Sequence, residues 1–273
     1  MALRLSANLS FLFADRPWGA RFDAAADAGF AGVELNPPMP YLETPAQLAR
    51  RLKGHRLACP LIVAPLGEGD AALGHACLPG AEADFRDSIR RAIDYADAAA
   101  IPLIHPSAGR LPPGVARAEG ERVYADNLAW AAECVRGAGV RLCIEPVCEM
   151  RTPGFFLQTL GQARDLIARS GSKDIGLVFD VFHVEQQEGD ALARLGDVLP
   201  DVVHVQVSDM PNRHVPGTGT IDFPALFRAL DEGGYQGWIG CEYDDATGSG
   251  GFEWAAGLSH VPLRAPAMTN EGE

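Results

Sequence analysis

The unit that repeats along this chain is clearest in residues 140–180, which read VRLCIEPVCEMRTPGFFLQTLGQARDLIARSGSKDIGLVFD. A short apolar run, Val140 to Ile144, precedes a stretch of helical period from Leu157 to Ala168, which ends near Gly171. A second apolar run then covers Ile175 to Phe179. Short apolar runs predict buried strands, and a helix between two of them predicts parallel pairing through a crossover connection.

The same alternation extends over the whole chain. Eight strands are expected, at Leu3–Leu9, Gly32–Leu35, Leu57–Val63, Pro102–His105, Val140–Ile144, Ile175–Phe179, Val202–Val207 and Trp238–Cys241. Helices are expected at Pro17–Ala28, Thr44–Lys53, Ala81–Ala99, Glu119–Arg136, Leu157–Ala168, Asp190–Leu199, Phe223–Leu230 and Phe252–Leu258. Eight is the number at which such a parallel sheet closes, so we predict an α/β fold, a single (β/α)8 TIM barrel. An open doubly wound sheet is the alternative, but no Gly-x-Gly-x-x-Gly follows the first strand.

Length and composition agree with one domain. The 273 residues are 47% hydrophobic and 22% charged, as in ordinary globular proteins. TIM barrels of about 250 residues are common as single units. We therefore expect residues 1–258 to form the barrel and residues 259–273, rich in Pro, Ala, Thr, Asn and Glu, to form a poorly ordered tail.

The charge balance excludes some classes of partner. The chain has 36 acidic and 23 basic residues and a net charge of −13, which disfavours binding to nucleic acid or to an anionic membrane surface. No apolar stretch approaches the roughly 18 residues of a membrane span. The first residues do not resemble a secretory signal, and the six cysteines contain no Cys-x-x-Cys pair. We expect reduced thiols and a cytoplasmic location, and the sequence leaves a homo-oligomer open.

Polar residues end most of the expected strands. In a TIM barrel the functional residues lie at the carboxyl ends of the strands. The polar strand ends here are Glu34, His105, Glu145, Asp180, Gln206, Asp209 and Glu242. Four of them follow an apolar run directly on the fifth to eighth strands, in Leu142-Cys-Ile-Glu, Leu177-Val-Phe-Asp, Val203-His-Val-Gln and Ile239-Gly-Cys-Glu.

Carboxylates that converge on one barrel mouth repel each other unless a cation joins them. Three carboxylates and an amide oxygen suit Mg²⁺ or Mn²⁺ better than Zn²⁺, which prefers nitrogen and sulfur. The sequence therefore predicts a divalent metal site formed by Glu145, Asp180, Gln206 and Glu242. For any one acidic strand end, capping of the next helix or exposure to solvent is the alternative interpretation.

Three further segments lie near this mouth. His183 is placed on the loop after Asp180, where a packed or surface histidine is the alternative. Arg213 and His214 belong to a loop rich in Pro and Gly, where cationic side chains are suited to an anionic substrate, although solvated loop charges would give the same pattern. Cys148 is interpreted as a packed or pocket-lining thiol rather than a nucleophile.

Many segments together resemble a known family. The matching segments are Leu5-Ser-Ala-Asn-Leu-Ser-Phe-Leu-Phe, Gly29-Phe-Ala-Gly-Val-Glu, Cys77-Leu-Pro-Gly, Ile144-Glu-Pro, Pro153-Gly-Phe-Phe-Leu, Asp180-Val-Phe-His, His204-Val-Gln-Val-Ser-Asp, Arg213-His-Val-Pro-Gly-Thr-Gly and Gly240-Cys-Glu-Tyr. They resemble the hydroxypyruvate isomerase family of the xylose-isomerase-like TIM barrels, in unbroken order from residue 3 to residue 258. The order and number of the segments make this resemblance more specific than any single motif.

The resemblance implies an intramolecular oxidoreductase of the aldose–ketose isomerase type. Its implied metal ligands are Glu145, Asp180, Gln206 and Glu242; Glu145 and Glu242 also transfer protons, and His183 and Arg213 face the substrate. The family interconverts hydroxypyruvate and tartronate semialdehyde, and close relatives isomerise 2-oxo-tetronates. The expected substrate is a small anionic hydroxy-oxo acid, isomerised through an enediolate with a divalent metal as Lewis acid.

The rim of the expected site departs from the family pattern. After Glu145-Pro146 the chain has Val147-Cys148-Glu149-Met150, where the family usually has Ile-Asn-Ser/Thr-Arg. After the third strand it has Val63-Ala64-Pro65, where the family usually has Asn-Leu-Pro. Near His183 it has Glu185, where the family usually has Gln. We expect the small Cys148 and Ala64 to leave room for a fourth substrate carbon. The alternatives are a ketose or 2-oxo-acid epimerase on the same scaffold, which typically has His in place of Gln206, and a barrel that binds a sugar acid without turnover.

Overall fold

The structure is a computed structural model that describes residues 4–244 and 253–256. Its strands form a single sheet in the order β2-β1-β8-β7-β6-β5-β4-β3, and all the neighbouring strands pair in parallel. The strands are β1 Arg4–Asn8, β2 Gly32–Glu34, β3 Leu61–Val63, β4 Leu103–His105, β5 Arg141–Ile144, β6 Ile175–Asp180, β7 Val202–Val207 and β8 Trp238–Cys241.

The two edges of this sheet lie side by side and nearly close it into a barrel. Parallel bridges join Gly32 to Ala58 and Leu35 to Ile62. The N–H of Val33 donates to the carbonyl of Ala58 over 2.8 Å, and a second such bond across the seam measures 3.0 Å. This contact between β2 and β3 is weaker than the other pairings, so the barrel is nearly closed. The predicted (β/α)8 TIM barrel is confirmed.

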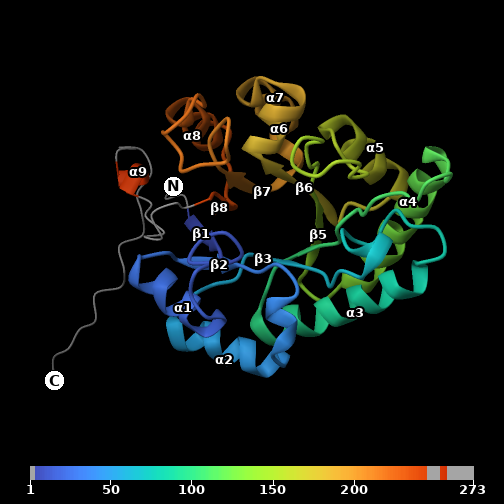
Figure 1. Cartoon of the computed structure of the whole chain (residues 1–273), viewed down its shortest axis with the longest axis horizontal. Helices are drawn as coiled ribbons and strands as arrows, with labels where there is room; N and C mark the ends of the chain where they lie inside the picture. Colours follow the sequence, from blue (N-terminus) through green and yellow to red (C-terminus); the bar gives the residue numbers. More distant parts are fainter. Residues whose placement is uncertain (1–3, 245–252, 257–273) are drawn as a thin grey trace.

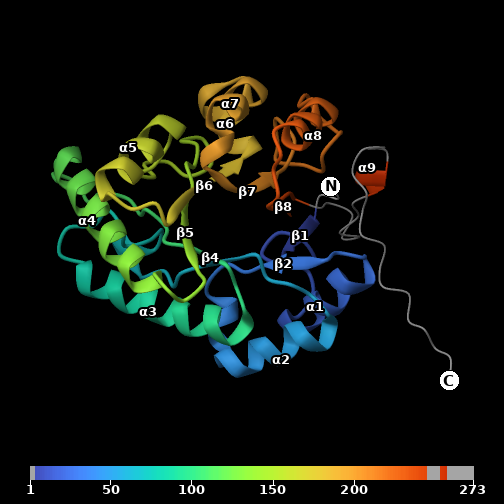
Figure 2. The ribbon, with the colours of Figure 1, turned by 180° about the vertical axis from the view of Figure 1, so that it is seen from behind.

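The helices form an outer ring around the strands, and α1 to α8 follow one another around it in chain order (Figures 1 and 2). They are α1 Trp18–Asp27, α2 Pro45–His55, α3 Glu82–Ala99, α4 Arg117–Val135, α5 Leu160–Ser170, α6 Val181–Glu188, α7 Ala191–Val198, α8 Phe223–Glu232 and α9 Glu253–Ala256. Three short 3-10 helices lie at Met39–Leu42, Gly69–Ala71 and Leu199–Asp201.

Two expected elements differ from the structure. The third strand begins at Leu61 rather than at Leu57, because Pro60 has no N–H to donate to a ladder. The segment after β6 was expected to be a loop carrying His183, but it is the helix α6. The apolar start of this segment has the composition of a strand, but Asp180 caps it as a helix: Oδ1 of Asp180 accepts from the N–H of Phe182 and of His183.

The strands separate an apolar outer core from a mixed barrel interior. Side chains such as Ile62, Ile104 and Leu142 point outward and join the large core under the helices. Because side chains alternate along a strand, their neighbours point inward. Leu61, Leu103, Cys143 and Val178 form a small separate cluster inside the barrel. Polar side chains fill the remainder of the interior up to the carboxyl ends of the strands.

Some expectations fall outside the described residues. These are the tail at 259–273 and three residues, 252, 257 and 258, of the helix expected at 252–258, whose described part is α9. Within residues 4–244 and 253–256, no helix is both long and apolar enough to cross a membrane. All six cysteines are free, as expected.

Candidate active site

The barrel brings the four predicted metal ligands to one mouth. Asp180 pairs in register with Gln206, and Gln206 pairs with Gly240, two residues before Glu242. Asp180, Gln206 and Glu242 are buried, with 1%, 3% and 7% exposure, and Glu145 is slightly more accessible. Parallel strands present their carboxyl ends at the same edge, so the sequence spacing alone places these side chains together.

A cavity of about 350 Å³ opens at this mouth. Glu145, Gln206 and Glu242 line it. Apolar side chains, among them Phe11 and Phe155, form much of the remaining wall. Asp180, His183 and Arg213 do not belong to the wall and are buried behind it. The six predicted site residues therefore form two layers, three facing the cavity and three supporting it.

Arg213 bridges two of the carboxylates. Its Nη2 donates to Oε1 of Glu242 and, over 3.2 Å, to Oδ2 of Asp180, while Nε donates to the backbone carbonyl of Glu242 over 3.2 Å. The guanidinium also lies against the ring of Phe11, 4.6 Å from its centroid. Burial lowers the pKa of Arg213, but the surrounding carboxylates more than offset this and raise it. Arg213 therefore carries a full positive charge inside the acidic cluster rather than in solvent.

One guanidinium does not neutralise the cluster. Glu145, Asp180 and Glu242 outnumber Arg213 by two negative charges when all are ionised. Burial, followed by repulsion from Glu242 and Asp180, raises the pKa of Glu145 well above its ordinary value. Burial likewise raises the pKa of Glu242 to about 8, against the opposing effect of Arg213. The mouth therefore favours either a bound proton or a further cation.

Gln206 offers an oxygen to such a cation. Its Nε2 donates to Oε2 of Glu34 over 2.9 Å and to Oε2 of Glu242 over 2.5 Å. Its Oε1 is buried and has no hydrogen-bond partner within the described residues. A buried carbonyl oxygen without a partner is costly unless it accepts a donor or a metal ion.

His183 faces the same cluster as a hydrogen-bond donor. The N–H of Cys148 donates to Nδ1 of His183 over 3.3 Å. Since an N–H can only donate, Nδ1 is the unprotonated nitrogen and the neutral ring carries its hydrogen on Nε2. Burial lowers the pKa of His183 to about 4, so the ring is neutral at pH 7. Nε2 lies 3.7 Å from Oδ2 of Asp180 and 3.8 Å from Oε1 of Glu145.

The donor set fits a hard divalent cation. Ligand atoms of Glu145, Asp180 and His183 all lie within 4.8 Å of one another. In this tautomer the Nε2 of His183 bears a hydrogen and cannot coordinate, whereas the unpartnered Oε1 of Gln206 can. The remaining donors are carboxylate oxygens, and an all-oxygen set is typical of Mg²⁺ or Mn²⁺ sites.

Asp180 has two roles, and the alternative interpretation of an acidic strand end, capping of the next helix, holds for it. Its Oδ1 caps α6, and its Oδ2 accepts from Arg213 over 3.2 Å. The cap fixes the carboxylate, and it also fixes the first turn of α6, which carries His183. The position of His183 thus depends on the residue three places before it.

The loop after β7 holds Arg213 in place. The carboxylate of Asp209 accepts four backbone N–H bonds, from Met210, Gly217, Gly219 and Ile221, at 2.8–3.1 Å. Arg213 itself has a left-handed φ of 59°, which a flexible loop would not maintain for a residue with a side chain. Its neighbour His214, by contrast, is exposed.

Residues from β1, β2 and β4 complete the site, and the sequence did not assign them a role. Asn8 donates to Oε2 of Glu242 over 2.9 Å, and Nδ1 of His105 lies 3.7 Å from Oε2 of Glu145. Glu34 is fully buried beneath Gln206. In the sequence, Glu34 and His105 already stood out as polar strand ends. Asn8 could have been found because it alternates with another polar residue, Ser6, along the first strand.

The altered rim lies partly away from the cavity. Val63 and Val147 line the wall, but Ala64 and Cys148 do not, so the room expected from these two small residues is not where the substrate would lie. Cys148 instead contacts the ring of His183, with Sγ 3.2 Å from Nδ1. Glu185 accepts from the N–H of Ala191 over 2.7 Å and so joins α6 to α7.

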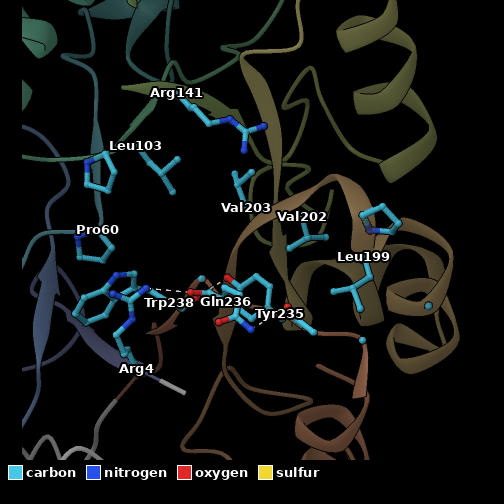
Figure 3. A pocket seen from close by; sticks show the side chains of 16 residues that line it. Arg4, Pro60, Leu103, Arg141, Leu199, Val202, Val203, Tyr235, Gln236 and Trp238 are labelled. Atoms are coloured by element: carbon cyan, nitrogen blue, oxygen red, sulfur yellow. Dashed lines mark hydrogen bonds between the residues drawn. The ribbon is translucent and has the colours of Figure 1, made fainter. Parts of the chain in front are cut away.

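A larger cavity, of about 960 Å³, lies at the opposite, amino-terminal face of the barrel. Figure 3 shows Arg4 beside Trp238 and Gln236 on one side of it and Arg141 across from them. Among the described residues, no carboxylate, histidine or cysteine lines this cavity. The described part of its wall lacks the carboxylates that converge at the mouth, so the smaller cavity is the candidate active site.

Comparison with known proteins agrees with this fold. The model of the xylose isomerase-like TIM barrel family matches residues 22–262. The 2-oxo-tetronate isomerase of Cupriavidus necator is 37% identical over 92% of this chain and 96% of its own length. The hydroxypyruvate isomerase of Escherichia coli is 35% identical over 92% of this chain and 98% of its own length. A solved structure described as an AP endonuclease of family 2, from Brucella melitensis, superposes with a TM-score of 0.88 at 32% identity, over 93% of this chain and 98% of that one.

Proposed function

The chain belongs to the xylose isomerase-like TIM barrel family, and from this premise we propose that it interconverts a small hydroxylated 2-oxo acid and its aldehyde isomer. The chain is an enzyme, an isomerase of the aldose–ketose type. The proposed reaction is that of hydroxypyruvate and tartronate semialdehyde, with a four-carbon 2-oxo-tetronate as the second candidate substrate.

One observation carries the proposal: two buried glutamates with raised pKa values face the same small cavity. Glu145 and Glu242 reach it from β5 and β8. Burial raises the pKa of Glu242 to about 8 and that of Glu145 well above its ordinary value, and a carboxylate with a raised pKa is suited to both taking and returning a proton. An aldose–ketose isomerisation needs both transfers.

The protein's own groups account for each proton movement. One glutamate takes the proton from the carbon that bears the terminal hydroxyl group. The electron pair left on that carbon forms an enediolate, and the other glutamate delivers a proton to the neighbouring carbon that had been the carbonyl carbon. The proton of the terminal hydroxyl group passes to the oxygen of that neighbouring carbon, so the terminal carbon becomes the aldehyde. The net result moves the carbonyl by one carbon without any external oxidant.

Glu145, Asp180, Gln206 and Glu242 are the residues proposed to hold Mg²⁺ or Mn²⁺, which when bound would supply Lewis-acid stabilisation of the enediolate oxygens. The excess negative charge and the unpartnered oxygen of Gln206 support this assignment.

Arg213 and His183 are proposed to bind the substrate. Arg213 places a positive charge at the mouth of a strongly acidic protein, which favours a substrate with a carboxylate. His183 directs an N–H toward the acidic cluster, where a substrate oxygen can accept it. Both side chains are buried, so each acts from the layer behind the cavity wall.

The deciding experiment follows carbon-bound proton exchange with D₂O by NMR for hydroxypyruvate, a 2-oxo-tetronate and an uncharged ketose. We expect exchange and formation of the aldehyde isomer with the acids and much slower exchange with the ketose. Faster turnover of the neutral ketose would favour a sugar epimerase or isomerase instead. Binding of the acids without any exchange would point to a barrel that only binds a sugar acid.

A further inference from the structure

The side chain of Glu34 lies inside the barrel, beneath Gln206 at the mouth. It is fully buried, and its Oε1 accepts from Oγ of Ser6 over 2.6 Å and from Nε2 of His204 over 2.9 Å. A side chain at Gly240 would overlap the carboxylate, so the glycine makes room for it. The proposed reaction does not use Glu34, which neither lines the cavity nor belongs to the four proposed ligands.

The other oxygen of Glu34 acts on Gln206. A glutamine amide has one face that donates and one that accepts, and its orientation is set by its neighbours. Both acceptors around Nε2 of Gln206 are carboxylate oxygens, one from Glu34 at 2.9 Å and one from Glu242 at 2.5 Å. The reversed amide would place Oε1 against these two oxygens, and the resulting repulsion disfavours it.

The fixed orientation of this amide determines the surroundings of its oxygen, Oε1 of Gln206. Because Nε2 is held by two carboxylates, Oε1 is left buried and without a partner in the described part of the chain. We propose that Glu34 is a positioning residue, which fixes the amide of Gln206 so that its oxygen is available to a divalent cation. This inference rests on the proposed function, because it presumes that Gln206 is a metal ligand.

The test measures Mn²⁺ affinity by electron paramagnetic resonance, with no substrate and no turnover, for the full chain and three variants. Glu34→Gln keeps the shape but allows the amide at position 34 to donate as well as accept, so Gln206 loses its fixed orientation. Glu34→Asp keeps the charge but shortens the reach to Nε2. Ser6→Ala removes a different hydrogen bond of Glu34 and is the matched control.

We expect Glu34→Gln and Glu34→Asp each to weaken Mn²⁺ binding by about 10–100-fold, the range found when groups that orient metal ligands are removed. Ser6→Ala should stay within about twofold, and the metal-free thermal transition is recorded for each variant to confirm folding. Normal affinity in Glu34→Asp with a loss in Glu34→Gln would show that only the charge matters and would overturn the proposal. An equal loss in Ser6→Ala would also overturn it.

A measurement on the unmodified protein covers the case in which substitutions at position 34 do not fold. The side-chain amide signals of Gln206, identified by their loss in Gln206→Met, should be protected from solvent exchange with and without Mg²⁺. Fast exchange in both states would refute the positioning role. Failure of the unmodified chain to bind Mn²⁺ at all would instead refute the metal site in the proposed function, and the positioning role with it.

Discussion

The two ends of the barrel differ in the volume of their cavities and in the chemistry of the side chains that line them. The cavity at the amino-terminal base is the larger, about 960 Å³ against about 350 Å³ at the mouth. The charged side chains on its wall are Arg4 and Arg141 (Figure 3), whereas Glu145, Glu242 and His105 line the mouth. The comparison teaches that the volume of a cavity does not locate catalysis in this protein; converging buried groups with shifted pKa values do.

The base and the mouth therefore contribute to different properties. At the base, Leu103 belongs to an apolar cluster inside the barrel, where burial contributes to stability. At the mouth, burial of charge costs stability and yields carboxylates with raised pKa values. Substitutions at the mouth should change rate or binding, and those at the base should change stability alone.

The largest effect is expected from removing a proton-transfer group. Glu242→Gln and Glu145→Gln each keep an oxygen ligand and the side-chain shape but remove the base, so kcat should fall by about 10²–10⁴. Steady-state kinetics on hydroxypyruvate measures this. Arg141→Ala at the base is the control and should stay within about twofold. Near-normal turnover by Glu242→Gln would refute the assignment.

A smaller loss is expected at Arg213. Charge-assisted hydrogen bonds contribute about 1.5–3 kcal/mol, so Arg213→Ala should lower kcat/KM for the acid by about 10–100-fold. Arg213→Lys keeps the positive charge but lacks the forked guanidinium, so it should restore only part of the lost kcat/KM. Arg151, an exposed arginine whose guanidinium lies 3.9 Å from Asp244, provides the control Arg151→Ala. Equal losses on a neutral ketose would show that Arg213 only supports the carboxylates.

Metal binding should depend on pH. Glu242 has a pKa of about 8 in the metal-free protein, so below that pH a cation must displace its proton. Apparent Mn²⁺ affinity should therefore rise with pH from pH 6 to pH 8, by about tenfold per pH unit from Glu242 and more steeply where Glu145 also loses a proton. Calorimetry in buffers of different ionisation enthalpy measures the released protons. An affinity that is flat or falls over this range would contradict the predicted site.

The smallest effect on turnover is expected at the base. Leu103→Ala should lower the free energy of unfolding by about 2–3 kcal/mol, because it leaves a gap beside Leu61 and Val178. Below the thermal transition, kcat should stay within about twofold. Urea denaturation with parallel kinetics measures both quantities. A tenfold loss of kcat in folded Leu103→Ala would break the separation between base and mouth.

The sequence predicted the barrel and the strand-end residues for the same physical reason. Apolar runs such as Leu177-Val-Phe before Asp180 mark where a parallel strand ends, and the fold places all such ends on one side. Helix α6 could not be read in this way. Its start, Val181-Phe182, has the composition of a strand, and the cap, in which the N–H groups of Phe182 and His183 donate to Asp180, is a contact that composition does not reveal.

By itself, the sequence determined the architecture, the mouth at which the chemistry lies and the residue types gathered there, because strand period and strand order are local properties. Tertiary structure decided which of these side chains face the cavity and which support them. Glu34 lies 172 residues before Gln206 and 170 before His204, yet it binds both. Such contacts depend on how closely the barrel brings strands that are distant in the sequence together. Hydrophobic periodicity does not predict them. The orientation of Gln206 follows from its contacts with Glu34 and Glu242, and the tautomer of His183 follows from the N–H of Cys148.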